Sequence, residues 1–231
     1  IADMKISDDV VAFLLKDMQR LPTDLRLGLE VASCFGSCVK CSVIDILQSK
    51  GPQVVNLKEV LQRLSKQGLM DNVGGTMFRF VHDKIEQASY ELMAERPRRK
   101  LHMRFGLDLS ETLVNNPEND EILFLAVNQM NRGGPAALRH TSQKFMIAMW
   151  NLAAGRRAMD LSDCNTAFQL FQHGMSFLGS DHWVAHYYLS VNLFDAAAEA
   201  ACVLNRQPEV NLYSKQLYDH ARCFDDKLNC K

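Results

Sequence analysis

The sequence predicts a mainly α-helical fold, and three observations lead to that prediction. Short amphipathic helical patterns fill residues 8–67. A strong hairpin-turn signal, DNVGG at residues 71–75, precedes a short strand pattern. Helical patterns alone occupy the chain from residue 83 onward. Three or four helices followed by a β-hairpin is the order of a winged helix, and the later patterns predict an array of α-helical hairpins like tetratricopeptide repeats.

The first four predicted helices cover residues 8–20, 23–35, 42–48 and 56–67. In each of them apolar side chains recur at helical spacing and are expected to point inward. Asn56 is a suitable N-cap for the fourth helix, because its side-chain oxygen can accept a free backbone N–H of the first turn.

The return strand of the hairpin leads directly into a helix. Phe78, Phe80 and His82 recur at every second residue and are expected on one face of the strand. At Asp83 the apolar spacing changes to three and four residues, so a helix begins there, and the Asp83 carboxylate can accept N–H groups of its first turn. His82 therefore precedes a helix N-terminus, which is a place where an imidazole can meet an anion.

The rest of the chain is predicted to form consecutive helices with short connections. Two helices follow Asp83, with a break near Pro97, and a third centres on Ile122–Met130. Short connections require antiparallel neighbours, and the many alanines allow helices to approach closely. Four more helices are expected at about 137–159, 162–178, 182–204 and 208–226.

These patterns divide the chain into three regions. We expect a winged-helix domain over residues 1–82, a connecting helical region over 83–136 and the tetratricopeptide-like hairpins over 137–231. The 231 residues, 47% of them hydrophobic, are enough for a substantial core.

Composition also limits the classes of function. A net charge of -1 argues against a nucleic-acid surface spread over the whole molecule. No run of about 18 apolar residues is present, so no membrane segment is expected. Seven cysteines without the spacing of a secreted scaffold favour reduced thiols and a cytoplasmic location. Residue 1 is Ile rather than Met, so we expect a piece of a longer protein.

Four sequence segments carry a resemblance to a known family. Residues 80–90, FVHDKIEQASY, resemble the F-x-H-D-R-x-x-Q-A-A-Y segment of STAND-type signal-transduction ATPases. LHMRFG at 101–106, AVNQMNRG at 126–133 and NLAAGRRA at 151–158 are similar to later segments of that family, in the same order. The resemblance covers about residues 5–205.

The resemblance implies a position within a larger signalling protein. In this family an ATPase domain precedes a winged helix and a tetratricopeptide-like array, within multidomain serine/threonine kinases or hybrid histidine kinases. The present chain has no G-x-x-x-x-G-K-[ST] phosphate loop, and Asp8-Asp9 lacks the apolar strand that precedes a Walker B aspartate. We therefore expect no enzymatic activity and no cofactor in this fragment, with ADP or ATP bound elsewhere in the parent protein.

By the same resemblance, His82 and Asp83 are the main candidate site. Val81-His82-Asp83 is similar to the Met-His-Asp motif of related switch ATPases, whose His meets the β-phosphate of ADP. His82 would be the ADP sensor and Asp83 its helix-capping partner. The alternative is a buried His that only hydrogen-bonds to backbone at a strand end. The implied partners are the upstream nucleotide-binding domain and an unidentified protein on the helical array.

Two basic segments are further candidates. Arg96, Arg98, Arg99 and Lys100 form the densest basic run, which is either a solvated helix start or a contact for an acidic partner or the absent domain. Helix 56–67 carries Lys58, Arg63 and Lys66, so a DNA-binding transcriptional regulator is the alternative function. Glu59 offsets those charges, and nucleic acid is not the expected partner.

We expect no metal site and no catalytic residue. Cys34, Cys38 and Cys41 have zinc-like spacing but lack a fourth ligand. His182 and His186 are four residues apart, yet no Glu follows His182 as an H-E-x-x-H motif requires. Packing between helices is the expected role of the aromatic residues Trp150, Trp183, Tyr187 and Tyr188.

Overall fold

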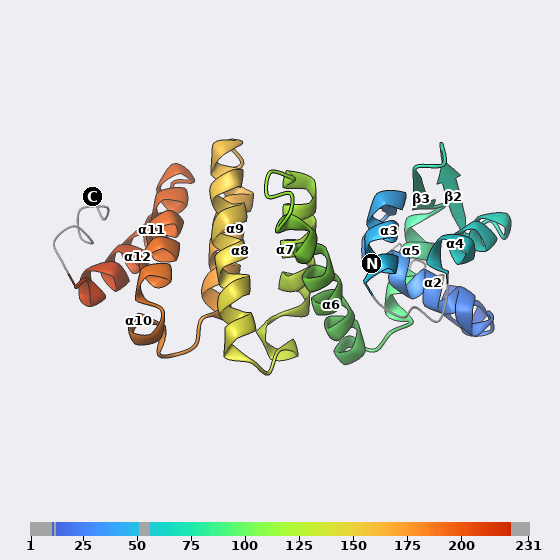
Figure 1. Cartoon of the computed structure of the whole chain (residues 1–231), viewed down its shortest axis with the longest axis horizontal. Coiled ribbons are helices and arrows are strands. Elements are labelled where there is room, and N and C mark those ends of the chain that lie inside the picture. The colour runs from blue at the N-terminus through green and yellow to red at the C-terminus, as the bar shows by residue number, and fades with distance from the viewer. Residues whose placement is uncertain (1–10, 12, 51–55, 223–231) are drawn as a thin grey trace, which may run out of the picture. The chain divides into compact units, whose positions relative to one another are not determined.

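The computed structural model describes residues 11, 13–50 and 56–222, and it confirms the predicted fold class (Figure 1). The chain is mainly helical, with a small antiparallel sheet near the N-terminus and paired helical hairpins after it. Two compact units form, residues 1–102 and residues 103–231. The pair Gly51-Pro52, which is typical of a turn, and Ser7, a candidate N-cap for the predicted helix over 8–20, lie outside the described residues.

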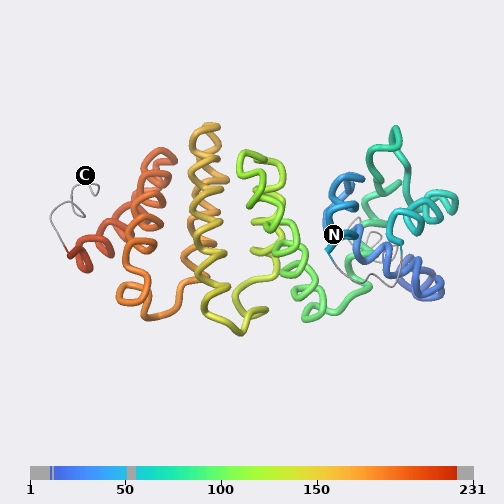
Figure 2. The backbone as a smooth tube through the Cα atoms, viewed as in Figure 1, coloured from blue at the N-terminus to red at the C-terminus, as the bar shows by residue number. Residues whose placement is uncertain are grey.

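The first unit has the element order of a winged helix. Residues 13–19 are helical and precede the first complete element. The hairpin after the third of the following helices is the wing, which Figure 2 traces. The elements are α2 (Thr23–Ser33), β1 (Cys38–Lys40), α3 (Cys41–Ser49), α4 (Leu57–Lys66), β2 (Met70–Val73) and β3 (Met77–Phe80).

The sheet has the order β1-β3-β2, and both strand pairs are antiparallel. Val39 lies opposite Phe78, and Met70 lies opposite Phe80. All four side chains are buried, so one face of the sheet covers the core of this unit. Strand β1 was not predicted, because three residues are too few to show an alternating pattern.

The predicted hairpin turn is confirmed and lies at Gly74-Gly75. Both glycines have positive φ, 58° and 69°, which glycine adopts without the steric cost of a Cβ. The Asn72 side chain accepts a hydrogen bond from Gly75 N at 3.0 Å, which fixes the turn from within.

Helix α4 forms as its sequence predicts. Asn56 caps it by accepting from Glu59 N at 3.3 Å. Its inward face fills the core between α2 and the sheet. The buried residues of that face are Leu57, Val60, Leu61 and Leu64.

Two helices follow the sheet, α5 (Asp83–Glu91) and α6 (Glu95–Leu113). The expected break near Pro97 falls just before Glu95, so Pro97 lies in the first turn of α6, where its missing N–H costs nothing. Helix α5 packs against α2, and Ser89 is buried there beside Met18. This packing includes α5 in the first unit.

The second unit consists of helical hairpins. Helices α8 and α9 lie side by side, as do α11 and α12, and α9 also packs against α11 (Figure 1). The predicted helix over 182–204 is in fact broken at His186 into two helices. The elements are α7 (Asp120–Gly133), η1 (Pro135–Ala137), α8 (Thr141–Asp160), α9 (Cys164–Phe177), α10 (His182–Ala185), α11 (Tyr187–Val203) and α12 (Gln207–His220).

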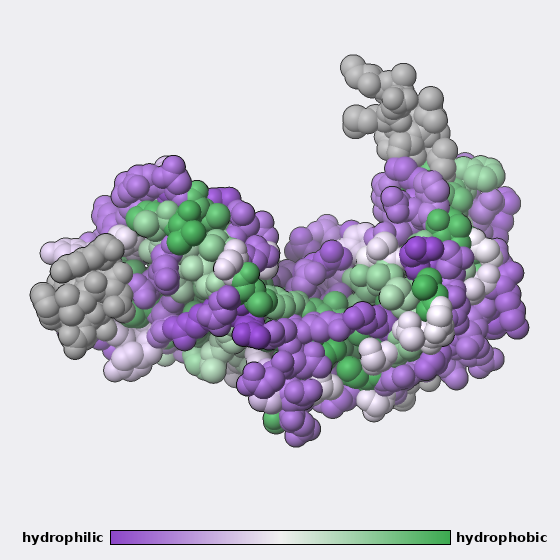
Figure 3. Space-filling model, turned by 90° about the horizontal axis from the view of Figure 1, so that it is seen from above, coloured by the Kyte–Doolittle hydropathy of each residue, from purple (hydrophilic) through white to green (hydrophobic). Residues whose placement is uncertain are grey.

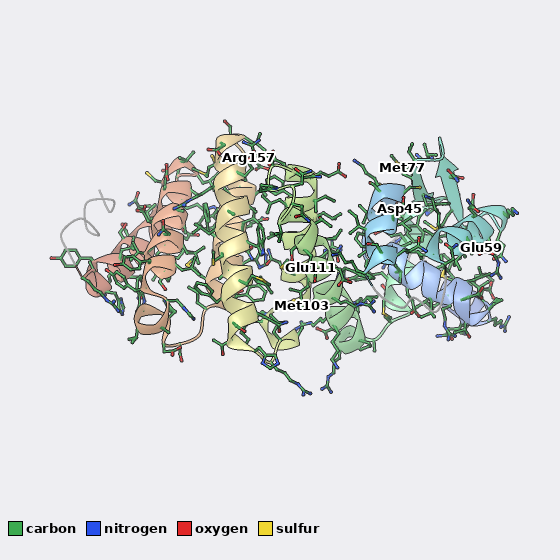
Figure 4. All side chains as sticks on the ribbon, in the orientation of Figure 1. Asp45, Glu59, Met77, Met103, Glu111 and Arg157 are labelled. Atoms are coloured by element: carbon green, nitrogen blue, oxygen red, sulfur yellow. The ribbon has the colours of Figure 1, made fainter. Side chains whose placement is uncertain are left out.

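Polar contacts align α7 with α8. The side-chain amides of Asn131 and Asn151 exchange two hydrogen bonds, at 2.8 and 3.0 Å. Asn151 is fully buried and also donates to Ile147 O, so its amide is satisfied in the core. Near the other end of α8, Arg157 (Figure 4) forms an ion pair with Asp120 at 2.8 Å. The two contacts together set the antiparallel register of these helices.

Small residues allow the helices of this unit to approach closely, as predicted. A Cβ on Gly155 would lie 2.3 Å from Cε1 of Phe171, so only glycine fits between α8 and α9 at that point. Ala154 and Ala158 are buried beside it. Apolar surface nevertheless remains exposed among hydrophilic surface on the face seen in Figure 3.

Candidate functional site

His82 occupies the corner between β3 and α5. Its backbone is extended, and its Nδ1 accepts a hydrogen bond from Lys84 N at 3.0 Å. His82 is therefore the N-cap of α5, which corrects the expectation that Asp83 would cap the helix. Asp83 is instead the first helical residue, where its negative charge still favours the positive end of the helix dipole.

The cap determines what the imidazole of His82 can do. A ring nitrogen that accepts a hydrogen bond carries no proton, so the neutral ring has its proton on Nε2. The residue is exposed, unlike Phe78 and Phe80, so the expectation that all three share one face is wrong for His82. The alternative of a buried His that only hydrogen-bonds to backbone is wrong about burial, but its hydrogen bond to backbone is observed, at Lys84 N. Within the described residues nothing accepts a hydrogen bond from Nε2, so this N–H can donate to an anion beside the start of α5.

The basic run at the start of α6 separates into two pairs. The Arg98 guanidinium lies 4.1 Å from the centre of the Tyr90 ring and donates to Tyr90 O, so it holds α5 and α6 together. Arg99 pairs with Glu95 at 2.6 Å. Arg96 and Lys100 are exposed and four residues apart on one helix face. They are the members of the run that remain available to a partner.

Helix α4 carries both positive and negative side chains. Lys58 forms an ion pair with Asp45 at 3.2 Å, and Arg63 forms one with Asp24, whose pKa is lowered by that hydrogen bond. Asp45 lies on α3 and Glu59 on α4 (Figure 4). Lys66 is exposed. Two of the three cations proposed to contact DNA are thus engaged by carboxylates of the same unit, which disfavours DNA binding.

The cysteines considered for zinc have separate environments. Cys34 Sγ donates to Glu30 O at 3.3 Å, and Cys41 Sγ donates to Gly75 O at 3.4 Å. Cys38 is exposed. Across residues 11, 13–50 and 56–222, no group of three or more His, Cys, Asp or Glu is arranged to hold a metal ion.

His182 and His186 belong to an aromatic cluster in the second unit. His182 stacks on Phe194 and its Nδ1 lies 2.9 Å from Ser190 Oγ, while His186 packs on Phe145. Burial lowers the pKa of His182, and the nearby positive charges of protonated His220 and His186 lower it further, against the opposing effect of Asp181. Burial also lowers the pKa of His173.

We expect the second unit to lose stability in mild acid. The folded pKa values of His182 and His173 lie below the ordinary value of about 6.5, so the unfolded chain takes up protons first as the pH falls. The stability that neutral rings contribute is complete above about pH 6.5 and is lost below it. Thermal denaturation between pH 7.5 and 5 measures this. His182→Gln should flatten the slope, whereas His140→Gln, at an exposed position, should not. Equal slopes in wild type and His182→Gln would contradict the prediction.

The sequence did not predict a groove that lies between α8 and α11. The groove has a volume of about 310 Å³, and its lining comes from one face of each helix. Tyr188 was expected to pack between helices, but it is 78% exposed at the edge of this groove. The lining residues are Phe145, Met149, Leu152, Ala153, Arg156, Tyr188, Leu189 and Asn192.

The groove is apolar at one end and polar at the other. Arg156 donates to Asn192 Oδ1, and Asn192 donates to Tyr188 O at 2.7 Å. One turn further along α11, burial and the neighbouring Glu199 raise the pKa of the Asp195 carboxyl, and Arg156 partly opposes them. The arrangement can receive an apolar side chain beside a charged one.

Comparison with models of protein families, with curated proteins and with solved structures finds no match to this chain. The family resemblance therefore rests on the four sequence segments alone. None of the helices in the described part of the chain has both the length and the apolar character needed to cross a bilayer.

Proposed function

We propose that this chain is a non-catalytic regulatory and interaction segment of a multidomain STAND-type signalling ATPase. It couples the nucleotide state of an ATPase domain elsewhere in the same protein to partner binding or to an attached kinase. The observation that carries the proposal is His82, whose exposed ring caps α5 through Nδ1 and thereby keeps Nε2–H available for an anion. The similarity of Val81-His82-Asp83 to the Met-His-Asp motif also supports a nucleotide-sensing role for His82.

The proposed mechanism is a population shift. The β-phosphate of ADP accepts a hydrogen bond from His82 Nε2 and lies at the positive end of the α5 dipole, which holds the winged helix against the nucleotide domain. In the proposed mechanism the phosphate chain of ATP makes this contact less well than that of ADP, so exchange of ADP for ATP releases the winged helix. Because α5 packs against α2, a displacement of the first turn of α5 also changes the packing within the first unit.

The proposal also gives a role to the other parts of the chain. The ATPase core, and any kinase, lie outside this chain, which has no phosphate loop. Arg96 and Lys100 contact the nucleotide domain or an acidic partner, since they are the exposed cations of their run. The helical hairpins bind a partner protein. A cytoplasmic location follows from the need for ADP and ATP.

We expect this chain to bind the separately produced ATPase domain of the longer protein more tightly in its ADP form than with a non-hydrolysable ATP analogue. Allosteric coupling commonly amounts to about 5- to 150-fold in affinity. Isothermal titration calorimetry with both nucleotide forms measures the ratio. His82→Asn should bring the ratio close to one, and Arg139→Ala, at an exposed position of the second unit, should leave it unchanged.

Equal affinity for the two nucleotide forms would overturn the proposal. A preference for ADP that survives in His82→Asn would assign nucleotide sensing to other residues.

A further inference from the structure

The groove between α8 and α11 has an open apolar floor. Phe145, Leu152 and Leu189 form its inner part, where they are half-buried or buried. Met149 is 50% exposed and Tyr188 is 78% exposed at its edge. A ligand that covers these two side chains removes apolar surface from water, which favours binding.

The size of the groove limits its occupant. A volume of about 310 Å³ accommodates one or two side chains and is at the small end of ligand pockets. Its lining of eight residues is far smaller than the roughly 20–30 residues that each side of a stable protein–protein interface contributes. An extended peptide segment that inserts a side chain is the occupant of matching size.

The charge beside the groove determines which peptide fits. Asn192, Asp195 and Glu199 follow one another at three- and four-residue spacing, so they lie on one face of α11. Neither carboxylate forms an ion pair with any residue of the described chain. Arg156, which lines the groove, donates its hydrogen bond to Asn192 and only partly offsets the charge of Asp195. The negative charge is therefore available to an incoming cation.

We propose that this groove binds an extended segment of a partner protein in which an apolar side chain is followed by Lys or Arg. The apolar side chain enters between Met149 and Tyr188, and the cation pairs with Asp195 and Glu199. An acidic segment is disfavoured, because two carboxylates and one arginine give this part of the surface a net negative charge. The inference rests on the proposed role of the helical hairpins in partner binding and specifies the chemistry of that partner.

Two fluorescein-labelled ten-residue peptides test the inference by fluorescence anisotropy with the whole 231-residue chain. Both contain the same two leucines, and they differ only in carrying three arginines or three glutamates. We expect the basic peptide to bind at least about tenfold more tightly. Added salt should weaken its binding, because the pairing charges are partly exposed.

Variants at exposed or half-buried positions locate the binding. Tyr188→Ala should weaken the basic peptide about tenfold, and Asp195→Asn with Glu199→Gln should reduce both its affinity and its salt dependence. Val184→Ala is the matched control, because Val184 is 80% exposed on α10 and does not line the groove. The Val184→Ala variant should bind the basic peptide with the affinity of wild type.

The inference would be overturned if the two peptides bound equally or if the acidic peptide bound more tightly. It would also be overturned if Tyr188→Ala left the affinity for the basic peptide unchanged. The assay contains no nucleotide and no ATPase domain. A failure here together with an intact ADP preference in the domain titration would therefore reject the groove assignment alone. A loss of the ADP preference with intact peptide binding would reject only the nucleotide switch.

Discussion

Gly106→Ala should destabilise the second unit by about 2–3 kcal/mol, although alanine normally stabilises a helix relative to glycine by about 1 kcal/mol. A Cβ on Gly106 would lie 2.5 Å from Met130 Cγ, 2.8 Å from Ala126 O and 2.8 Å from Met130 N. Two of these atoms belong to the backbone of α7, so no side-chain rotation relieves the overlap. Helices α6 and α7 would have to separate, with loss of the packing between them.

Gly174→Ala is the matched control for that experiment. Its new Cβ would lie 2.7 Å from Leu193 Cδ2, the end of a flexible side chain, and 3.1 Å from Asn151 Cβ, with no backbone atom of a neighbouring helix closer than 3.4 Å. Urea unfolding of both variants should give a clearly smaller loss of unfolding free energy for Gly174→Ala. A Gly106→Ala protein as stable as wild type would contradict the close approach of α6 to α7.

The second large effect is expected at His82, where two substitutions separate structure from nucleotide binding. Asparagine is a good N-cap, so His82→Asn should keep α5 capped and the melting temperature close to that of wild type. His82→Ala should lose about 0.5–2 kcal/mol of stability with the cap. Both remove Nε2–H, and a hydrogen bond to a charged group contributes about 1.5–3 kcal/mol, so both should weaken ADP binding at least tenfold in the longer protein.

The turn from β3 into α5 could be predicted because the apolar period changes there within a few residues. Phe78 and Phe80 alternate, and the helical spacing begins at Asp83. The identity of the cap could not be predicted in the same way. Aspartate is the commoner cap, and only the path of the backbone places His82 rather than Asp83 in the capping position.

Several residues of the segments that carry the family resemblance contact one another. Tyr90 Oη lies 3.0 Å from His102 Nε2, which joins the first segment to the second. Asn131 and Asn151 exchange hydrogen bonds between the third and fourth segments. These pairs are 12 and 20 residues apart, so no local pattern reveals them. In this chain, residues of these segments therefore help to hold neighbouring helices together.

Neither the helix break at His186 nor the groove could be predicted from local sequence patterns. No Gly or Pro marks the break, and aromatic packing of His182 and Trp183 accounts for the short helix before it. The groove depends on two helices that are distant in sequence. In the sequence, the spacing of Tyr188, Asn192, Asp195 and Glu199 predicts that these residues share one polar face of a helix. It does not predict that α8 forms the other side of the groove.

The measurement that tests the account most directly is the amount of ADP that co-purifies with the longer protein, in wild type and in His82→Asn. Nucleotide extracted from equal amounts of folded protein is identified and quantified by chromatography. We expect ADP in the wild type and at least about tenfold less in the variant, while the melting temperature of the 231-residue chain alone is unchanged by the substitution. Equal ADP in both proteins would reduce His82 to a helix cap and contradict the proposed switch.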